Sequence, residues 1–325
     1  MKDLNRRQFL KSLSVLGVGV ATSNYLKVRG QDQKPDDAKK SAEGGSASGG
    51  KPEPKPMVAV VEGNKPAEIT LAALGILGGI DKFVKKDSVV VLKPNIAWEK
   101  PMELAATTNP EIVLTVAKEC FKAGAKKVKI VERVCNDPKK CFQICGFENT
   151  FQKSGVEFVL LTNDPKEYKE VKIPNGKELQ SILIAKDVLE CDTFINIPIA
   201  KHHATAKLTL GIKNLMGIVG VDRRLLHHNL GQKMADILSA IKPHLTIIDA
   251  YRVLVRNGPT GGNPKDVAAV RKVIASVDTV AADSYACTLK PFSLEGKNVS
   301  CVQAAYDMGL GEMNLDKIDI VEKKL

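Results

Sequence analysis

Residues 88–95 read Ser-Val-Val-Val-Leu-Lys-Pro-Asn, an unbroken apolar run that ends in a lysine, a proline and an asparagine. A parallel strand covered on both faces is apolar throughout, whereas a strand with one wet face alternates apolar and polar residues. The run therefore predicts a buried parallel strand. Because ligands of open parallel sheets bind outside the carboxyl ends of the strands, Lys93 and Asn95 become candidate site residues.

Similar segments recur along the chain, with helical patterns between them. Residues 109–111, Asn-Pro-Glu, are typical of a helix start, and Gly124 marks the expected end of that helix. The alternation predicts an α/β fold with a mostly parallel sheet and helices on both faces. Asn175-Gly176, between two apolar runs, indicates an added antiparallel hairpin. The expected strands cover residues 58–61, 88–92, 128–131, 156–161, 193–197, 245–248 and 272–276.

Composition divides the chain into three segments. Residues 1–30 contain Arg6-Arg7, then an apolar stretch, and then Lys27 and Arg29, a pattern typical of a twin-arginine signal. The apolar stretch is about half of the ~20 residues that a membrane-spanning helix needs, so no stable membrane span is expected. Residues 31–56 lack large apolar side chains and predict a disordered linker. Residues 57–325 have the composition of one globular domain.

These features predict a protein that the twin-arginine translocase exports to the periplasm or the cell envelope. The net charge is +11, and residues 1–30 contribute +5 of it, which leaves +6 for the rest. With one Trp and no dense basic cluster, the chain is not expected to bind nucleic acid. The sequence indicates no oligomeric state.

Polar residues follow most of the expected strands. If the sheet is parallel, they converge on one edge, where ammonium, imidazole and carboxylate groups suit an anionic ligand, acid/base chemistry or a metal. Taken singly, each group is also interpretable as a strand end, a cap or a turn, so the prediction depends on the convergence. The groups are Lys93 and Asn95, Glu132-Arg133, Lys201 with His202-His203, Asp249 with the loop 258–262, and Asp278 with Asp283.

Two histidine pairs, His202-His203 and His227-His228, are candidates for metal binding or proton transfer. Adjacent residues on a helix point about 100° apart, so at most one histidine of each pair is expected to face a given site. For the second pair, a loop before a helix at residues 230–241 is the other interpretation. His203 is the first choice.

Residues 195–219 carry a resemblance to a known family. They read Ile-Asn-Ile-Pro-Ile-Ala-Lys-His-His-Ala-Thr-Ala-Lys-Leu-Thr-Leu-Gly-Ile-Lys-Asn-Leu-Met-Gly-Ile-Val, which resembles the domain-of-unknown-function 362 family. The resemblance covers nearly all of residues 57–325. It extends to Lys93-Pro94-Asn95, residues 249–250, residues 257–260, residues 275–283 and Gly309-Leu310-Gly311.

The resemblance implies site residues but no reaction. Many members of the family carry a ferredoxin-like module, which implies a redox or iron–sulfur context, but this chain has no Cys-x-x-Cys-x-x-Cys-x-x-x-Cys-Pro run. The family's polar positions match Lys201, His203, Lys213, Asn214, Asp249 and Asp283. With the strand ends, this gives the expected catalytic residues Lys93, Asn95, Lys201, His203, Asp249 and Asp283, and the expected cofactor-binding residues Lys213, Asn214, Gly258 and Thr260.

Three of the seven cysteines, Cys135, Cys141 and Cys145, form a cluster of candidate metal ligands. Three thiolates can hold an iron–sulfur cluster, and a route that accepts folded cargo would carry an assembled cofactor. Zinc is a second interpretation. A disulfide or three unliganded thiols is a third, because the spacing matches none of the common iron–sulfur or zinc signatures. Cys141 and Cys145 are expected to share one helix face.

Three hypotheses of function follow. The first is an exported, redox-linked cofactor-binding protein with an iron–sulfur centre beside a Lys/His/Asp cleft. The second is a metal-dependent or cofactor-free enzyme acting on an anionic small molecule. In it, His203 would be the acid/base, Lys93 and Lys201 would hold negative charge, and Asp249 or Asp283 would orient a metal or an amine. The third is a non-enzymatic ligand-binding module.

Overall fold

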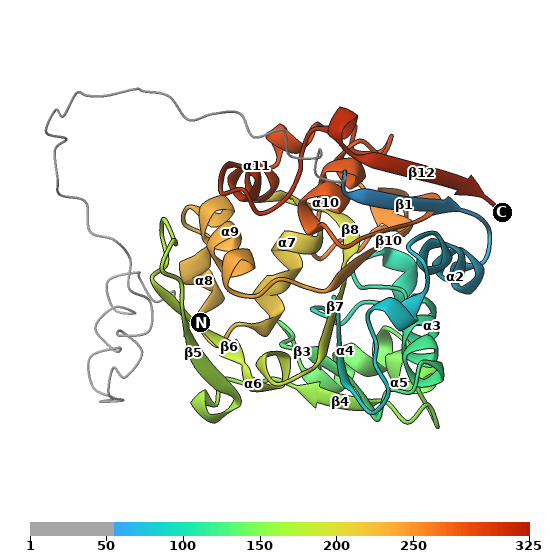
Figure 1. The fold of residues 1–325 in the computed structure, drawn as a ribbon, viewed down its shortest axis with the longest axis horizontal. Coiled ribbons are helices and arrows are strands. Elements are labelled where there is room, and N and C mark those ends of the chain that lie inside the picture. The colour runs from blue at the N-terminus through green and yellow to red at the C-terminus, as the bar shows by residue number, and fades with distance from the viewer. Residues whose placement is uncertain (1–54) are drawn as a thin grey trace, which may run out of the picture.

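The computed structural model describes residues 55–325, so the expected signal and nearly all of the expected linker lie outside the described residues. A ten-stranded sheet runs through the described part (Figure 1). Eight of its strands lie in the order β12-β1-β11-β10-β7-β2-β3-β4, and β8 and β9 extend from β10. The strands are β1 (Met57–Glu62), β2 (Val89–Pro94), β3 (Lys127–Glu132), β4 (Glu157–Leu160), β7 (Thr193–Ile197), β8 (Ile199–His203), β9 (Lys207–Thr209), β10 (Leu245–Leu254), β11 (Val267–Ser276) and β12 (Asp319–Lys324).

Two hydrophobic clusters cover the two faces of the sheet, as the apolar runs predict. One includes residues of α2 and α3, and the other residues of α9, α10 and α11 (Figure 1). In β2, Val90 and Leu92 belong to the first cluster and Val91 to the second, so this strand is buried on both faces. The helices are α2 (Pro66–Ile76), α3 (Pro110–Lys122), α4 (Pro138–Ile144), α5 (Phe147–Thr150), α6 (Lys186–Leu189), α7 (Gly211–Asn214), α8 (Arg223–Leu226), α9 (Leu230–Ala240), α10 (Thr279–Cys287) and α11 (Ser300–Asp307).

The predicted α/β class, with its mostly parallel sheet and added hairpin, is confirmed. The hairpin pairs β5 (Tyr168–Lys172) with β6 (Ser181–Ala185) in antiparallel register as a separate two-stranded sheet. The predicted helix start is also confirmed, since the Asn109 side chain accepts a hydrogen bond from the Glu111 N–H and Pro110 begins α3.

One expectation about the sheet is wrong. Strand β11 runs antiparallel to both β1 and β10, and Ser276 at its end pairs with Thr246 at the start of β10. The residues that follow β11 therefore lie at the amino ends of the parallel strands. Asp278 and Asp283 do not converge with the lysines by this route, because strand burial alone does not specify strand direction.

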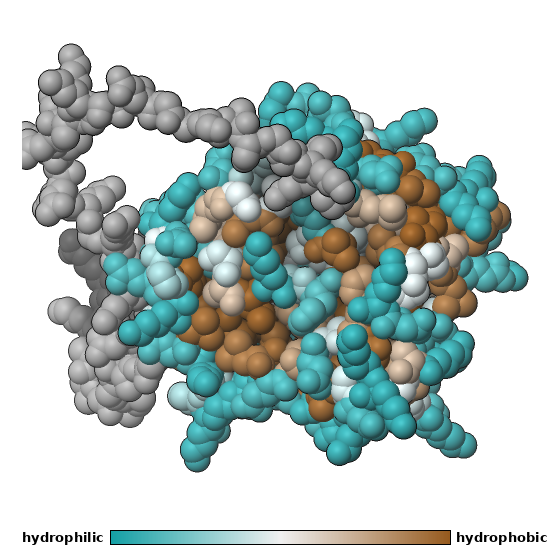
Figure 2. All heavy atoms as spheres, viewed as in Figure 1, coloured by the Kyte–Doolittle hydropathy of each residue, from teal (hydrophilic) through white to brown (hydrophobic). Residues whose placement is uncertain are grey.

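The surface view shows hydrophilic residues projecting around the molecule, with apolar residues gathered between them (Figure 2). In the described part of the chain, no helix is both long enough and apolar enough to span a membrane.

Candidate functional site

A cavity of about 320 Å³ lies where the carboxyl ends of β2 and β3 meet β8, β9 and α7. It is the meeting point that the polar ends of strands 88–92 and 128–131 predict. Five lysines and arginines line it, and Glu132 is the one carboxylate among its lining residues in the described part of the chain. The polar residues of the wall are Lys93, Asn95, Trp98, Glu132, Arg133, Cys135, Lys201, His203, Thr205, Thr209, Lys213, Asn214, Arg223 and His227.

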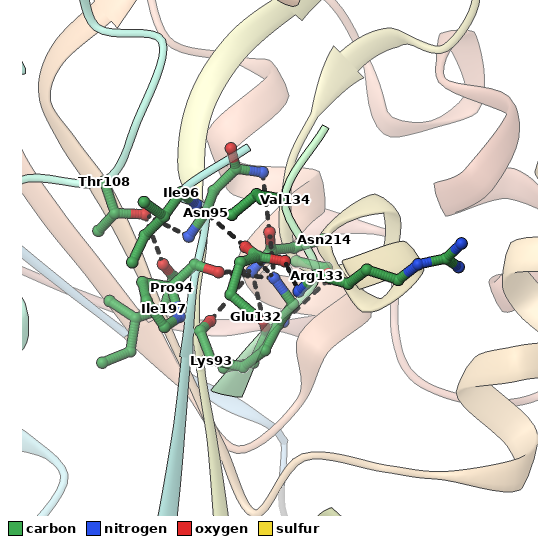
Figure 3. Close-up of polar contacts among 12 residues, drawn as sticks. Lys93, Pro94, Asn95, Ile96, Thr108, Glu132, Arg133, Val134, Ile197 and Asn214 are labelled. Carbon is green, nitrogen blue, oxygen red and sulfur yellow. Dashed lines mark hydrogen bonds and ion pairs between the residues drawn. The ribbon is translucent and has the colours of Figure 1, made fainter. Parts of the chain in front are cut away.

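Lys93 and Glu132, which both line this cavity, form a buried ion pair (Figure 3). The Lys93 Nζ lies 2.8 Å from Glu132 Oε2, and the two side chains are 1% and 2% exposed. Glu132 also accepts hydrogen bonds from the backbone N–H groups of Ile96 and Arg133. Burial lowers the pKa of Lys93, and the Glu132 carboxylate opposes that shift. Because the hydrogen-bonding groups of this buried ion pair already have partners within the protein, we assign the pair a structural role.

Asn214 connects this pair to the neighbouring strands. Its Oδ1 accepts hydrogen bonds from Asn95 Nδ2 at 2.9 Å and Lys93 Nζ at 3.2 Å, and its Nδ2 donates to Asn196 Oδ1 at 2.8 Å (Figure 3). The residues come from α7, β2 and β7, which are far apart in the sequence. The amide therefore fixes the position of α7 against the sheet, and the preceding residue of α7, Lys213, lines the cavity.

Lys201 and Lys213 differ from Lys93 because no carboxylate pairs with either of them within residues 55–325. Lys201 Nζ donates to Asn95 Oδ1 at 3.1 Å and to the Ala106 carbonyl at 2.5 Å. Lys213 Nζ donates to Met216 Sδ at 3.2 Å. Burial, together with the nearby Lys213 ammonium, lowers the pKa of Lys201 to about 7. Burial likewise lowers the pKa of Lys213 to about 8.

His203 is held in one tautomer. Its Nδ1 accepts hydrogen bonds from the backbone N–H groups of Thr205 at 3.1 Å and Ala206 at 3.2 Å, so the ring proton resides on Nε2. Burial lowers the pKa of His203 to about 3, and Lys213 contributes to the shift, so the ring is neutral at physiological pH. The His227 ring lies 6.1 Å away, centroid to centroid. His203 therefore contributes its Nε2–H to the cavity wall as a hydrogen-bond donor.

Neither histidine pair lies within a helix. His202 and His203 lie on strand β8, where successive side chains point to opposite faces, so one of them lines the cavity. His202 Nδ1 accepts from the Gly258 N–H instead. His227 follows α8 and lines the cavity, whereas His228 does not.

Two arginines of the wall bind backbone carbonyls. Arg133 Nη1 donates to the Val219 and Val221 carbonyls, and its Nη2 donates to Asn163 Oδ1. Arg223 donates to the carbonyls of Arg133 and Val134. These guanidinium groups hold the segment after α7 against the end of β3, and they add two positive charges to the wall.

Thr209 leaves a polar atom unsatisfied at the cavity. Within residues 55–325, its buried hydroxyl has no hydrogen-bond partner, and Thr209 is 3% exposed. A buried hydroxyl without a partner costs roughly 1–3 kcal/mol. Such an atom in a cavity wall is a position where a ligand supplies the missing partner.

Four of the ten expected catalytic and cofactor-binding residues do not line the cavity. Asp249 lies inside the long strand β10, and its carboxylate accepts from the Asn109 and Tyr251 N–H groups. Asp283 accepts from the Gly211 and Ile212 N–H groups at the start of α7. Burial raises the pKa of Asp249 to about 6 and that of Asp283 to about 7.

Gly258 and Thr260 are the other two. A Cβ on Gly258 would lie 1.9 Å from the His202 carbonyl oxygen, so glycine permits this loop to approach β8. Neither Gly258 nor Thr260 lines the cavity, although the intervening Pro259 does.

The structure separates the three candidate metal ligands. Cys135 is exposed and lines the cavity. Cys141 and Cys145 are 0% and 1% exposed and belong to the hydrophobic cluster that includes Phe142 and Phe147. All three are free thiols, and no group of three or more His, Cys, Asp or Glu side chains able to hold a metal occurs within residues 55–325. An iron–sulfur centre stays a prediction, which this geometry does not support.

Thr209 and Arg223 are among the wall residues that the sequence did not point to. They come from short or irregular elements whose position depends on tertiary contacts, and no local pattern marks them. Glu132, Arg133 and His227 were candidates from a strand end and a histidine pair, and all three line the cavity.

A family model described as "Domain of unknown function (DUF362)" matches residues 90–288, and the chain belongs to this family. A thylakoid-associated protein from Synechocystis sp. is 27% identical over 216 residues, which are 64% of this chain and 64% of that protein. The chain therefore spans less than two thirds of the length of this curated relative.

Two solved structures are more distantly similar. The lactate racemase apoprotein from Thermoanaerobacterium thermosaccharolyticum has a TM-score of 0.44 and 13% identity, over 70% of this chain and 56% of that one. A structural-genomics protein from Thermotoga maritima has a TM-score of 0.40 and 13% identity, over 69% of this chain and 58% of that one. At these TM-scores, neither similarity assigns an activity.

Proposed function

We propose that this protein is an enzyme that acts on a small organic anion bound in the cavity. The observation that carries the proposal is the pair of buried ammonium groups, Lys201 and Lys213, that face one cavity without a carboxylate partner in the described residues. Burying an unpaired charge is costly, and a bound carboxylate or phosphate group removes that cost.

The lining charges have the sign that this ligand requires. Lys201, Lys213, Arg133 and Arg223 are cationic, and the single carboxylate, Glu132, is already paired with Lys93. The His203 Nε2–H and the Thr209 hydroxyl provide neutral donors. An anion in this cavity would accept hydrogen bonds from groups that otherwise have few partners.

The same wall supports catalysis as well as binding. A side chain whose pKa lies near the working pH exchanges protons most effectively, and the pKa of Lys201 is about 7. Cys135 adds a thiol to the same wall. These groups favour the cofactor-free form of the enzyme hypothesis over an iron–sulfur protein. Export by the twin-arginine route remains part of the proposal.

Isothermal titration calorimetry tests the binding step. Oxalate, pyruvate and phosphate are titrated into the wild-type chain, with pyruvamide as the uncharged control. We expect at least one anion to bind, pyruvamide to bind much more weakly, and Lys201→Met to weaken anion binding by about tenfold or more, since a hydrogen bond to a charged group is worth roughly 1.5–3 kcal/mol.

The exposed Lys290 provides the matched control, because Lys290→Met removes the same charge outside the cavity. This variant is expected to bind like the wild type. Equal losses of anion affinity in both variants would mean that the effect comes from the overall charge of the protein and not from the cavity. Absence of binding heat with all of the anions would contradict the proposal.

A further inference from the structure

Lys213 has the least engaged amine among the three buried lysines of the wall. Lys93 Nζ has three oxygen acceptors, and Lys201 Nζ has two. Lys213 Nζ has a thioether sulfur, Met216 Sδ, which is a weak acceptor. Its side chain is nevertheless buried, with 8% of the residue exposed, and it lines the cavity.

The surroundings of this amine are also those of a nucleophile. Burial disfavours the protonated form of Lys213, the positive charges of Arg223 and Lys93 also lower its pKa, and the Cys301 and Cys135 thiols oppose this shift. Lys201 lies close enough for its ammonium group to interact with that of Lys213. A lysine next to other cations in a desolvated site is the arrangement that makes an amine nucleophilic near neutral pH. The Thr209 hydroxyl of the same wall also lacks a hydrogen-bond partner within residues 55–325.

We propose that the anion bound here carries a carbonyl group next to its charge, as a 2-oxo acid does, and that Lys213 forms an imine with that carbonyl. The proposal rests on the anion-binding function above and names its substrate class. Lys201 and the neutral donors hold the carboxylate, which leaves the carbonyl carbon for Lys213 Nζ. Lys213 is therefore assigned as the nucleophile.

The step balances without an added oxidant or reductant. The Lys213 Nζ lone pair attacks the carbonyl carbon, and one N–H proton passes to the oxygen to give a carbinolamine. The C–O bond then breaks, and the oxygen leaves as water with the second N–H proton. With a pKa of about 8, a useful fraction of Lys213 is neutral and able to attack at pH 7–8.

Reductive trapping tests the assignment on the wild-type chain. The purified full-length protein is incubated with pyruvate and then treated with sodium borohydride, which reduces an imine to a stable secondary amine. Intact mass spectrometry is expected to show a single added group, and peptide mapping is expected to place it on Lys213. Acetone, which has the carbonyl but no charge, is expected to label about tenfold less at the same concentration, since each tenfold is 1.4 kcal/mol of binding.

Two variants complete the test. Lys213→Arg keeps the positive charge and removes the nucleophile, so it is expected to lose the adduct and still to be stabilised thermally by pyruvate. Lys290→Arg is expected to be labelled like the wild type. Peptide mapping of the wild type decides the question even if Lys213→Arg does not fold.

The failures of the two proposals are distinguishable. Pyruvate binding in the calorimeter without a reducible adduct would overturn the imine and leave the anion site intact. An adduct on Lys201, or adducts spread over exposed lysines, would also overturn the assignment to Lys213. Absence of both binding and adduct would overturn both proposals.

Discussion

Two buried lysine environments share one cavity wall. Lys93 is paired with Glu132, and its amine is surrounded by oxygen acceptors, whereas Lys213 lies beside a thioether and has no carboxylate partner in residues 55–325. Both side chains are buried. Lys93 is 0% exposed and Lys213 is 8% exposed, so the main difference between them is the number and strength of the hydrogen-bond acceptors around each amine.

This contrast distinguishes buried polar groups that hold the fold together from buried polar groups that are available to a ligand. A buried network with every valence used makes the fold unique but has nothing to offer a ligand. A buried cation or hydroxyl with unused valences lowers stability, and a ligand that satisfies it regains that free energy as affinity. The predictions below either break the satisfied cluster or alter the unsatisfied one.

The largest effect is expected from Glu132→Gln, which leaves the Lys93 ammonium buried without a counter-charge. Removing one partner of a buried pair costs about 3–5 kcal/mol of unfolding free energy. Urea unfolding at neutral pH measures the loss. Glu119→Gln is the control, because Glu119 pairs with the exposed Lys122, and an exposed pair is worth less than about 1 kcal/mol. Similar losses in the two variants would mean that Lys93 is satisfied without Glu132.

Lys213→Met is expected to leave stability intact and to weaken anion binding, the opposite of what is expected for Glu132→Gln. Because no carboxylate loses its partner, the unfolding free energy should be unchanged or higher by about 1 kcal/mol. Anion affinity should fall by about tenfold or more, as calorimetry measures. A loss of stability as large as that of Glu132→Gln, with affinity retained, would assign Lys213 to the structural cluster.

Anion affinity is expected to fall as the pH rises from about 6 to about 9. Binding favours the protonated lysines, and the pKa values of Lys201 and Lys213 in the free protein are about 7 and about 8. Both are charged below this window and both are neutral above it. Proton uptake should accompany binding within the window, which calorimetry in two buffers of different ionisation enthalpy detects. Affinity that rises with pH would contradict the assignment of these lysines as ligand cations.

The smallest effect is expected from Thr209→Val, which removes the unsatisfied hydroxyl at nearly constant volume. We expect unchanged or slightly higher stability, and anion affinity lowered about fivefold, in line with a net hydrogen bond of roughly 1 kcal/mol. Thr107→Val is the matched control, because the Thr107 hydroxyl is also buried without a partner in the described residues but does not line the cavity. An equal change of affinity in both variants would remove Thr209 from the site.

Local chemistry made part of this molecule predictable. The apolar run 89–92 predicted β2 and its polar end, the residues at 109–111 predicted the start of α3, and Asn175-Gly176 predicted the hairpin. Each depends on neighbouring residues or on a simple period. Lys93, Asn95, Lys201, His203, Lys213 and Asn214 were all selected beforehand and all line the cavity.

The remainder depended on tertiary structure. The direction of β11 is set by its partners, so Asp283 could not be placed at the correct end of the sheet from its own segment. Asp249 was expected after a strand that in fact continues to Leu254. The spacing of Cys135, Cys141 and Cys145 suggested a common ligand, but the helix α4 packs the last two thiols among phenylalanines.

The fixed tautomer of His203 has a consequence for selectivity. With Nδ1 occupied by two backbone N–H groups, the ring presents a proton and no lone pair, and the neighbouring lysines present protons as well. Glu132, the carboxylate of the wall, already accepts hydrogen bonds from Lys93 Nζ and from the backbone N–H groups of Ile96 and Arg133. A molecule that brings its own ammonium group would meet repulsion here, so we expect the cavity to discriminate between an amino acid and the 2-oxo acid with the same carbon skeleton, and to favour the amine-free one.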